Sequence, residues 1–140
     1  MSSPRPTAPG SKPLLLAVLL CEAIAVERTR QKTSLLGLCD RVWAPEFPVQ
    51  LPLSLYCRLV GAQGAIQIEV RFVERDTDTL HAAFARTFTA PDRLEAAEVL
   101  FDLPPLVFPR PGRYEFQVAA DGAFLGAIFM DAVLIAAPTR

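Results

Sequence analysis

Apolar and polar side chains alternate along much of this chain. The alternation is clearest over residues 53–59, whose apolar positions are Leu53, Leu55, Cys57 and Leu59. Successive side chains of a β-strand point to opposite faces, so a period of two predicts a strand with one buried face. Residues 66–72 repeat the pattern after a short turn. The short connection predicts that these two strands are antiparallel.

Longer apolar runs lie towards the two ends of the chain. Residues 14–26 and 34–43 are apolar and are separated by a polar turn, which predicts a hairpin. Residues 114–118 alternate again. Residues 124–136 are apolar on both faces apart from Asp131, and a strand of this kind is expected at the centre of a sheet.

The region between these segments is less regular. Residues 80–88 predict a weaker strand and residues 99–103 predict another. Residues 94–99 fit either one helical turn or the start of a strand, because two glutamates in this segment lie three residues apart. The Pro-rich residues 104–112 predict a stiff connection between sheets, with a polyproline ligand as the alternative.

Together these segments predict an all-β fold, a two-sheet antiparallel β-sandwich of about eight short strands with at most one short helical turn. The sequence Pro-Gly-x-Tyr-x-Phe at 111–116 resembles the tyrosine-corner region of immunoglobulin-like domains. In such a corner the hydroxyl of Tyr114 would form a hydrogen bond with the backbone of a residue that precedes it in the chain. The alternative is that Tyr114 is an ordinary half-exposed aromatic residue.

Composition limits the domain count and the class of partner. The chain has 140 residues, 51% of them apolar, which is too apolar for a disordered protein. We expect one domain over residues 14–137, preceded by a flexible Pro/Ser-rich tail at 1–13. Fourteen basic residues balance fifteen acidic ones, which argues against nucleic-acid binding. No apolar run approaches the roughly 20 residues that a membrane-spanning helix needs.

The sequence lacks a recognisable catalytic or metal-binding motif. Its only histidine, His81, lies out of phase with its apolar neighbours, and its three cysteines, 21, 39 and 57, form no C-x-x-C pair. Asp76 and Asp78 supply too few oxygens for calcium. We therefore expect no enzyme activity, no catalytic or cofactor-binding residues, no metal and no cofactor.

Two carboxylates stand within apolar strands. Glu22 lies in the run 14–26, and Asp131 lies in the run 124–136. A buried carboxylate must be paired or must shift its pKa. Arg41 is a plausible partner, and we expect a buried ion pair among these residues rather than a reactive site.

A candidate contact surface is predicted at residues 43–48. Trp43, Glu46 and Phe47 lie beside prolines in a loop, and exposed aromatic residues of this kind are common anchors of protein interfaces. The alternative is that the aromatic side chains cover the end of the core. We expect a protein partner or self-association into a homo-oligomer, and a bound small molecule has no support in the sequence.

Five segments of the chain form a recognisable set, namely Leu20-Cys21-Glu22, the segment 32–43, Phe47-Pro48, the segment 55–59, and Phe108-x-x-Pro-Gly-x-Tyr-x-Phe. Together they resemble a family of short bacterial proteins known only as a domain of unknown function. The resemblance runs from about residue 14 to residue 134. It departs from the family pattern at Glu22, where Asp is more usual, and at Cys39, where Phe is usual. The family supplies no activity and no catalytic residues.

The resemblance bears on residues 14–25, which also mimic a secretory signal. Residues 14–26 match the family's first strand, so cleavage there would remove it. We expect a cytoplasmic protein, with secretion as the alternative if this segment is a signal. The expected function is a non-enzymatic protein-binding or assembly module. The alternative is a small-ligand carrier or enzyme with a pocket between the two sheets.

Overall fold

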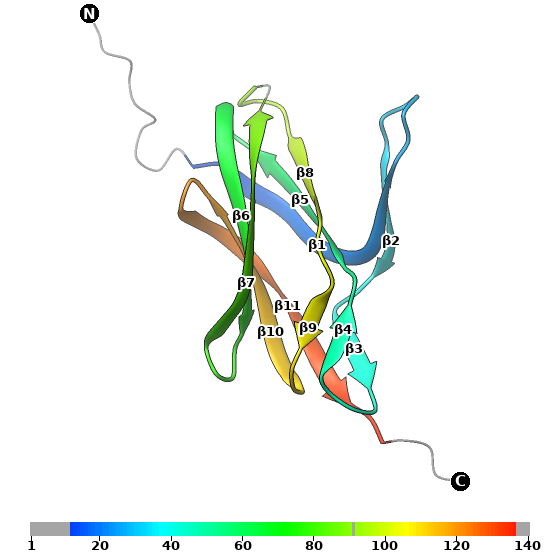
Figure 1. Ribbon diagram of the computed structural model, residues 1–140. Coiled ribbons are helices and arrows are strands. Elements are labelled where there is room, and N and C mark those ends of the chain that lie inside the picture. The colour runs from blue at the N-terminus through cyan, green and yellow to red at the C-terminus, as the bar shows by residue number, and fades with distance from the viewer. Residues whose placement is uncertain (1–11, 91, 137–140) are drawn as a thin grey trace, which may run out of the picture.

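The computed structural model describes residues 12–90 and 92–136, and these residues form eleven strands (Figure 1). The strands are β1 (Leu14–Val26), β2 (Thr33–Leu38), β3 (Arg41–Ala44), β4 (Val49–Leu51), β5 (Ser54–Val60), β6 (Gly64–Glu74), β7 (Thr79–Ala90), β8 (Ala97–Asp102), β9 (Leu106–Phe108), β10 (Gly112–Ala120) and β11 (Ala123–Leu134). The predicted all-β sandwich is confirmed. The expected tail lies outside the described residues, except for Lys12 and Pro13.

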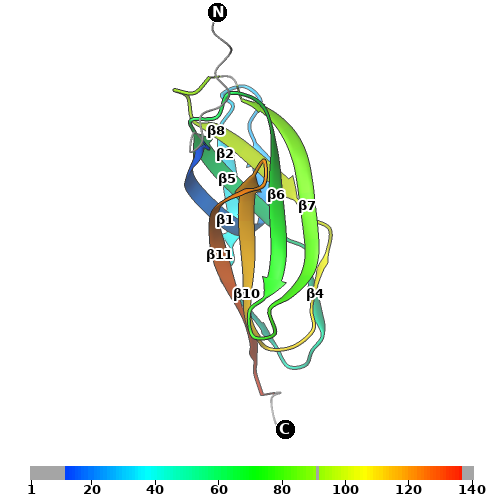
Figure 2. The same ribbon diagram turned by 90° about the vertical axis from the view of Figure 1, so that its left-hand side faces the viewer.

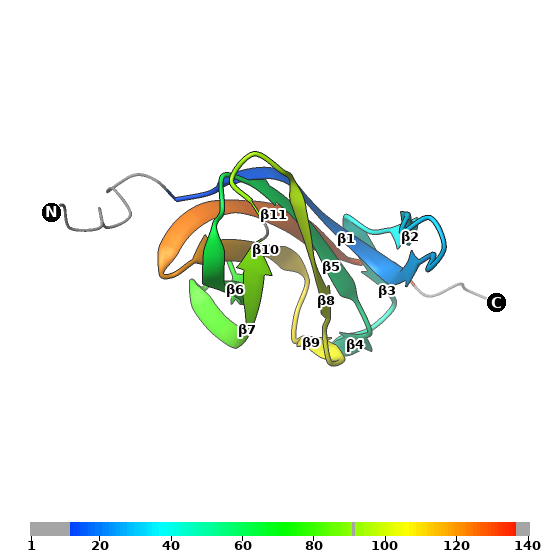
Figure 3. The same ribbon diagram turned by 90° about the horizontal axis from the view of Figure 1, so that it is seen from above.

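The strands form two main layers and one small sheet (Figures 2 and 3). A four-stranded sheet has the order β2-β1-β5-β8, and a five-stranded sheet has the order β3-β11-β10-β6-β7. Strands β4 and β9 pair beside them. All neighbours are antiparallel except β3 and β11, which are parallel. As predicted, β11 lies inside its sheet, between β3 and β10.

The core fills the space between the two sheets with apolar side chains. β5 contributes Leu55, Cys57 and Leu59, the alternate positions that the sequence predicts. Ser54 and Tyr56 on the other face of β5 are buried as well, which the alternation did not predict. The aromatic rings of Phe72, Phe108, Tyr114 and Phe116 gather at one end of this core. Phe72 is central, with its ring centre 4.9 Å from that of Phe116 and 5.4 Å from that of Tyr114. This aromatic cluster positions the polar site described below.

The strand predicted over residues 34–43 is in fact two strands in different sheets. β2 ends at Leu38, and β3 joins the five-stranded sheet, where the Asp131 amide donates a 3.1 Å hydrogen bond to the carbonyl of Asp40. The chain changes sheets because Val42 and Ala44 are buried against the core of the second layer. Apolar content alone did not reveal this break.

Residues 94–99 resolve in favour of a strand. β8 begins at Ala97 and pairs with β5, while the carboxylate of Asp92 accepts a 3.0 Å hydrogen bond from the amide of Leu94 in the preceding turn. The two very short strands β4 and β9 were not predicted. Among the described residues, no helix is long and apolar enough to cross a membrane.

Candidate functional site

Strand β3 forms one edge of the five-stranded sheet and exposes the only tryptophan of the chain. Val42 and Ala44 point inward and are buried, so Trp43 between them points outward and is 61% exposed. Trp43 stands directly opposite Val133 of β11. An exposed tryptophan on a sheet edge is the feature expected of a contact residue.

Further apolar and charged groups share the outer face of the sheet with Trp43. Phe129 and Ile135 are each 41% exposed, and the guanidinium of Arg113 lies 4.9 Å from the centre of the Phe129 ring. Asp40, Arg41 and Trp43 line a hollow of about 460 Å³. We call the surface formed by Arg41, Trp43, Phe129, Val133 and Ile135 the Trp43 surface.

The predicted contact residues divide between the surface and the core. Trp43 and Glu46 are exposed, whereas Phe47 is half-buried and packs against the core. Burial against the core, the alternative interpretation, therefore applies to Phe47 and not to Trp43. A contact through Trp43 stays a prediction.

The predicted buried ion pair is wrong. Glu22 and Arg41 are both exposed. Asp131 is partly buried, and the Nε atom of Arg113 donates a 2.8 Å hydrogen bond to its Oδ1 atom. The hydrogen bond from Arg113 lowers the pKa of Asp131. The apolar run 124–136 placed Asp131 correctly in a strand, but it could not show that this residue lies on the outer face of the sheet.

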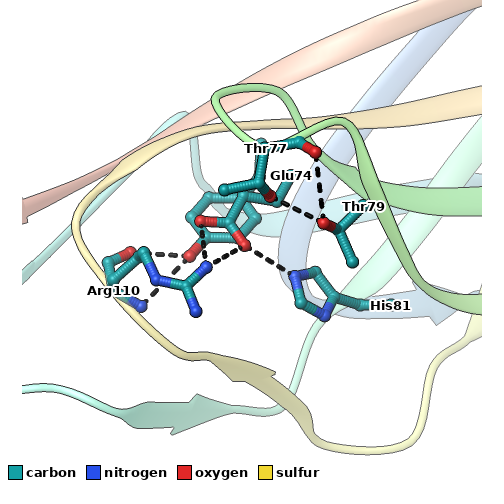
Figure 4. A network of polar contacts seen from close by, with 6 residues as sticks. Glu74, Thr77, Thr79, His81 and Arg110 are labelled. Atoms are coloured by element: carbon teal, nitrogen blue, oxygen red, sulfur yellow. Dashed lines mark hydrogen bonds and ion pairs between the residues drawn. The ribbon is translucent and has the colours of Figure 1, made fainter.

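A buried polar cluster lies at the end of β6, where Glu74 has no exposed surface. The Nη1 atom of Arg110 lies 2.6 Å from Oε1 and 2.7 Å from Oε2 of Glu74. The Nε2 atom of His81 lies 2.8 Å from Oε1 (Figure 4). The cluster joins three segments of the chain, namely the end of β6, the start of β7 and the turn before β10.

The electrostatics of the cluster keep Glu74 ionised. Burial alone raises the pKa of Glu74, but hydrogen bonds from His81 and Arg110 outweigh burial, so the pKa lies below its ordinary value. A carboxylate can only accept, so the Nε2 atom of His81 must carry the proton. In the neutral imidazole this leaves the Nδ1 atom as an acceptor.

Tyr114 holds the backbone of Arg110. Its hydroxyl donates a 2.6 Å hydrogen bond to the Arg110 carbonyl and accepts a 3.3 Å hydrogen bond from the Arg110 amide. This is the contact of a tyrosine corner, because the hydroxyl bonds backbone a few residues upstream. Tyr114 is fully buried, unlike the half-exposed aromatic residue of the alternative interpretation. The corner fixes the backbone from which Arg110 reaches Glu74.

A groove of about 500 Å³ runs past this cluster, between β7 and the Pro-rich segment. Its lining is mostly apolar and includes Phe72, Ala82, Phe84, Leu106 and Val107 together with Pro104, Pro105 and Pro109. His81 and Arg110 line its polar end, with side chains 24% and 53% exposed. The groove therefore combines an apolar trough with hydrogen-bonding groups at one end.

The thiols are poor nucleophiles. Burial raises the pKa of Cys57 to about 12 and also raises the pKa values of Cys21 and Cys39. A thiol with a raised pKa is protonated at neutral pH and unreactive. Within residues 12–90 and 92–136, no three His, Cys, Asp or Glu side chains gather to hold a metal ion.

Sequence reasoning missed the Glu74 cluster. The signal was present, because Glu74 continues the inward series 66, 68, 70, 72 of β6. Glu74 also begins the polar run 74–78, which is typical of a turn and hides the continuation of the strand. Its partner Arg110 lies 36 residues away in a different loop, and the spacing of residues along the sequence does not show that contact.

The model of a protein family of unknown function, DUF6941, matches residues 16–132. The chain belongs to this family. The resemblance to a family of unknown function, noted from the sequence, is thereby confirmed. The matched DUF6941 residues include Trp43 and the Glu74 cluster with Tyr114. No curated protein matches the chain significantly.

One solved structure similar to this DUF6941 chain is the CARDB domain of the PF1109 protein of Pyrococcus furiosus, in complex with di-metal ions. The two are 12% identical and superimpose with a TM-score of 0.43. The match covers 91% of the DUF6941 chain and all of the CARDB chain.

Proposed function

We propose that this protein is a non-enzymatic interaction module that associates with a second copy of itself through the Trp43 surface. The observation that carries the proposal is the 61% exposure of Trp43 on the edge strand β3. Tryptophan and arginine are the residue types most enriched among energetically dominant interface contacts. The Trp43 surface has both types on the same face of the sheet as exposed Phe129 and Ile135.

The energetic case rests on how much apolar area a partner would cover. A tryptophan side chain buries about 150–250 Å² when it is covered completely. Trp43, Phe129 and Ile135 each keep a large fraction of their surface in contact with water. Covering them removes this apolar area from water, which favours association.

The charges of the Trp43 surface favour a second copy as the partner. Asp40 and Arg41 are adjacent and line the same hollow as Trp43. In a two-fold symmetric contact the same patch of both copies meets. Asp40 of one copy can then lie opposite Arg41 of the other, and the reverse pair forms by symmetry. The hollow beside Trp43 gives a protruding Trp43 of the second copy a place to bind.

The proposal is tested by light scattering on the full chain at micromolar concentration. We expect a dimer of the 15.3 kDa chain. Trp43→Ala should raise the dimer dissociation constant by about 30-fold or more, as expected for removal of a dominant contact. Leu94→Ala is the matched control, because Leu94 is 87% exposed in a loop away from β3. Its dimer should be unchanged.

A charge exchange tests the symmetry of the contact. Arg41→Asp should weaken the dimer, and the double variant Asp40→Arg with Arg41→Asp should restore it. A monomeric wild-type chain overturns the proposal. So does a Trp43→Ala variant that dimerises as strongly as wild type.

A further inference from the structure

Strand β7 forms the other edge of the five-stranded sheet and lacks the usual protection of such an edge. Its twelve residues, Thr79–Ala90, include no Lys, Asp, Glu or Pro. The only arginine, Arg86, turns its guanidinium to the carbonyl of Leu100 across the open side of the sandwich. A long edge without outward charges or proline is a template for pairing with another strand.

The two walls of the groove beside β7 differ in backbone hydrogen-bonding capacity. Ala82 and Phe84 of β7 form one wall. The opposite wall includes Pro104, Pro105 and Pro109, which have no backbone N–H to donate. An extended chain in the groove can therefore form a ladder with β7 and make apolar contacts with the prolines. This arrangement is typical of peptides that bind by strand addition.

The polar end of the groove lies at the start of β7. His81 is the third residue of this strand, and Arg110 lines the groove beside it. An added antiparallel strand runs opposite to β7, so its carboxyl end reaches His81 and Arg110. Glu74 engages one nitrogen of Arg110, Nη1, and the guanidinium is 53% exposed. Arginine commonly binds carboxylates through more than one nitrogen.

We propose that the groove binds the carboxyl-terminal segment of a partner protein as an additional antiparallel strand on β7. Apolar side chains at alternate positions of the segment lie against Ala82, Phe84 and the prolines. The terminal carboxylate binds Arg110, whose position is fixed by Glu74 and by the Tyr114 corner. This site is separate from the Trp43 surface, because β3 and β7 are opposite edges of the same sheet.

The test is a selection from a displayed library of random eight-residue peptides that end in a free carboxylate. The full chain is the bait. We expect enrichment of peptides with apolar residues at alternate positions. Ala82→Glu places a charge inside the groove and should abolish capture. Ala83→Glu is the matched control, because Ala83 is exposed on the other face of β7, opposite Arg71, and should leave capture intact.

A second measurement uses only wild-type protein, so it does not depend on the folding of a variant. The best peptide is synthesised with a carboxylate end and with an amide end, and each is titrated by calorimetry. Loss of a hydrogen bond to a charged group should weaken the amide by about tenfold or more.

Three results would overturn the proposal. One is the absence of any enriched peptide, and another is equal affinity of the acid and the amide. The third is conversion of a dimer to a monomer by Ala82→Glu, since that would show that a second copy of the chain covers β7. None of these results depends on Trp43, so the two proposals can fail separately.

Discussion

Replacing Glu74 with glutamine would test whether the buried cluster stabilises the fold as a charged unit. The carboxylate accepts two contacts from Arg110 and one from His81, and it has no exposed surface. Glutamine keeps the shape of the glutamate side chain but lacks its charge. Its NH₂ group would also face the N–H donors of Arg110 and His81. A hydrogen bond to a charged group contributes about 1.5–3 kcal/mol. Arg110 is half-exposed, so solvent weakens its contribution and the hydrogen bonds do not add in full. We expect Glu74→Gln to lower the free energy of unfolding by about 2 kcal/mol.

The assay is urea unfolding at pH 7, followed by circular dichroism of the sheets. Glu69→Gln is the matched control, because Glu69 is on the same strand and its ion pair with Arg71 spans 4.0 Å on the solvated face. That exposed pair should contribute less than about 0.5 kcal/mol. A loss below about 0.5 kcal/mol for Glu74→Gln would refute the reasoning.

The effect of Glu74→Gln should depend on pH with a definite sign. The folded pKa of Glu74 lies below the ordinary value of 4.5. The ionised form is therefore favoured by folding, and its stabilisation is complete above the unfolded pKa. It is lost as the pH falls through the lower folded pKa. The difference between wild type and Glu74→Gln should shrink in acid, and a constant difference from pH 7 to pH 3 would contradict this account.

Two further predictions concern buried groups. Tyr114→Phe removes the hydroxyl that holds the carbonyl of Arg110 and should cost about 1 kcal/mol of stability in the same urea assay. An unchanged midpoint would show that the corner does not stabilise the fold. Cys57 is fully buried with a pKa of about 12, so iodoacetamide should modify the half-buried Cys39 of the native protein well before Cys57. Peptide mass mapping measures both, and rapid labelling of Cys57 would contradict its burial.

Much of the fold could be predicted from residues 53–59, 66–72 and 114–118, because one buried face imposes a period of two on each strand. The strands β4 and β9 have three residues each, which is too short for a period to appear. Their existence depends on their pairing with each other, which is a tertiary contact.

The candidate sites were harder to predict than the strands. Trp43 could be named as a candidate from its residue type alone, since tryptophan is enriched at protein interfaces, and the structure adds its exposure. The Glu74 cluster requires three segments that meet only in the folded chain. The environment of Asp131 depends on which side of its sheet faces water. Sequence periodicity shows which residues share one face of a strand, but it does not show whether that face packs against the other sheet or faces water.

The parallel pairing of β3 with β11 has a consequence for the order of folding. Arg41 is synthesised before its pairing partner Asp131, which follows it by 90 residues. Until β11 is synthesised, β3 has no neighbour in its sheet, and the backbone on both sides of Trp43 is unpaired. Contacts between such distant segments slow folding. Release of a nascent chain that lacks β11 would therefore expose the same edge through which we propose that the finished protein assembles.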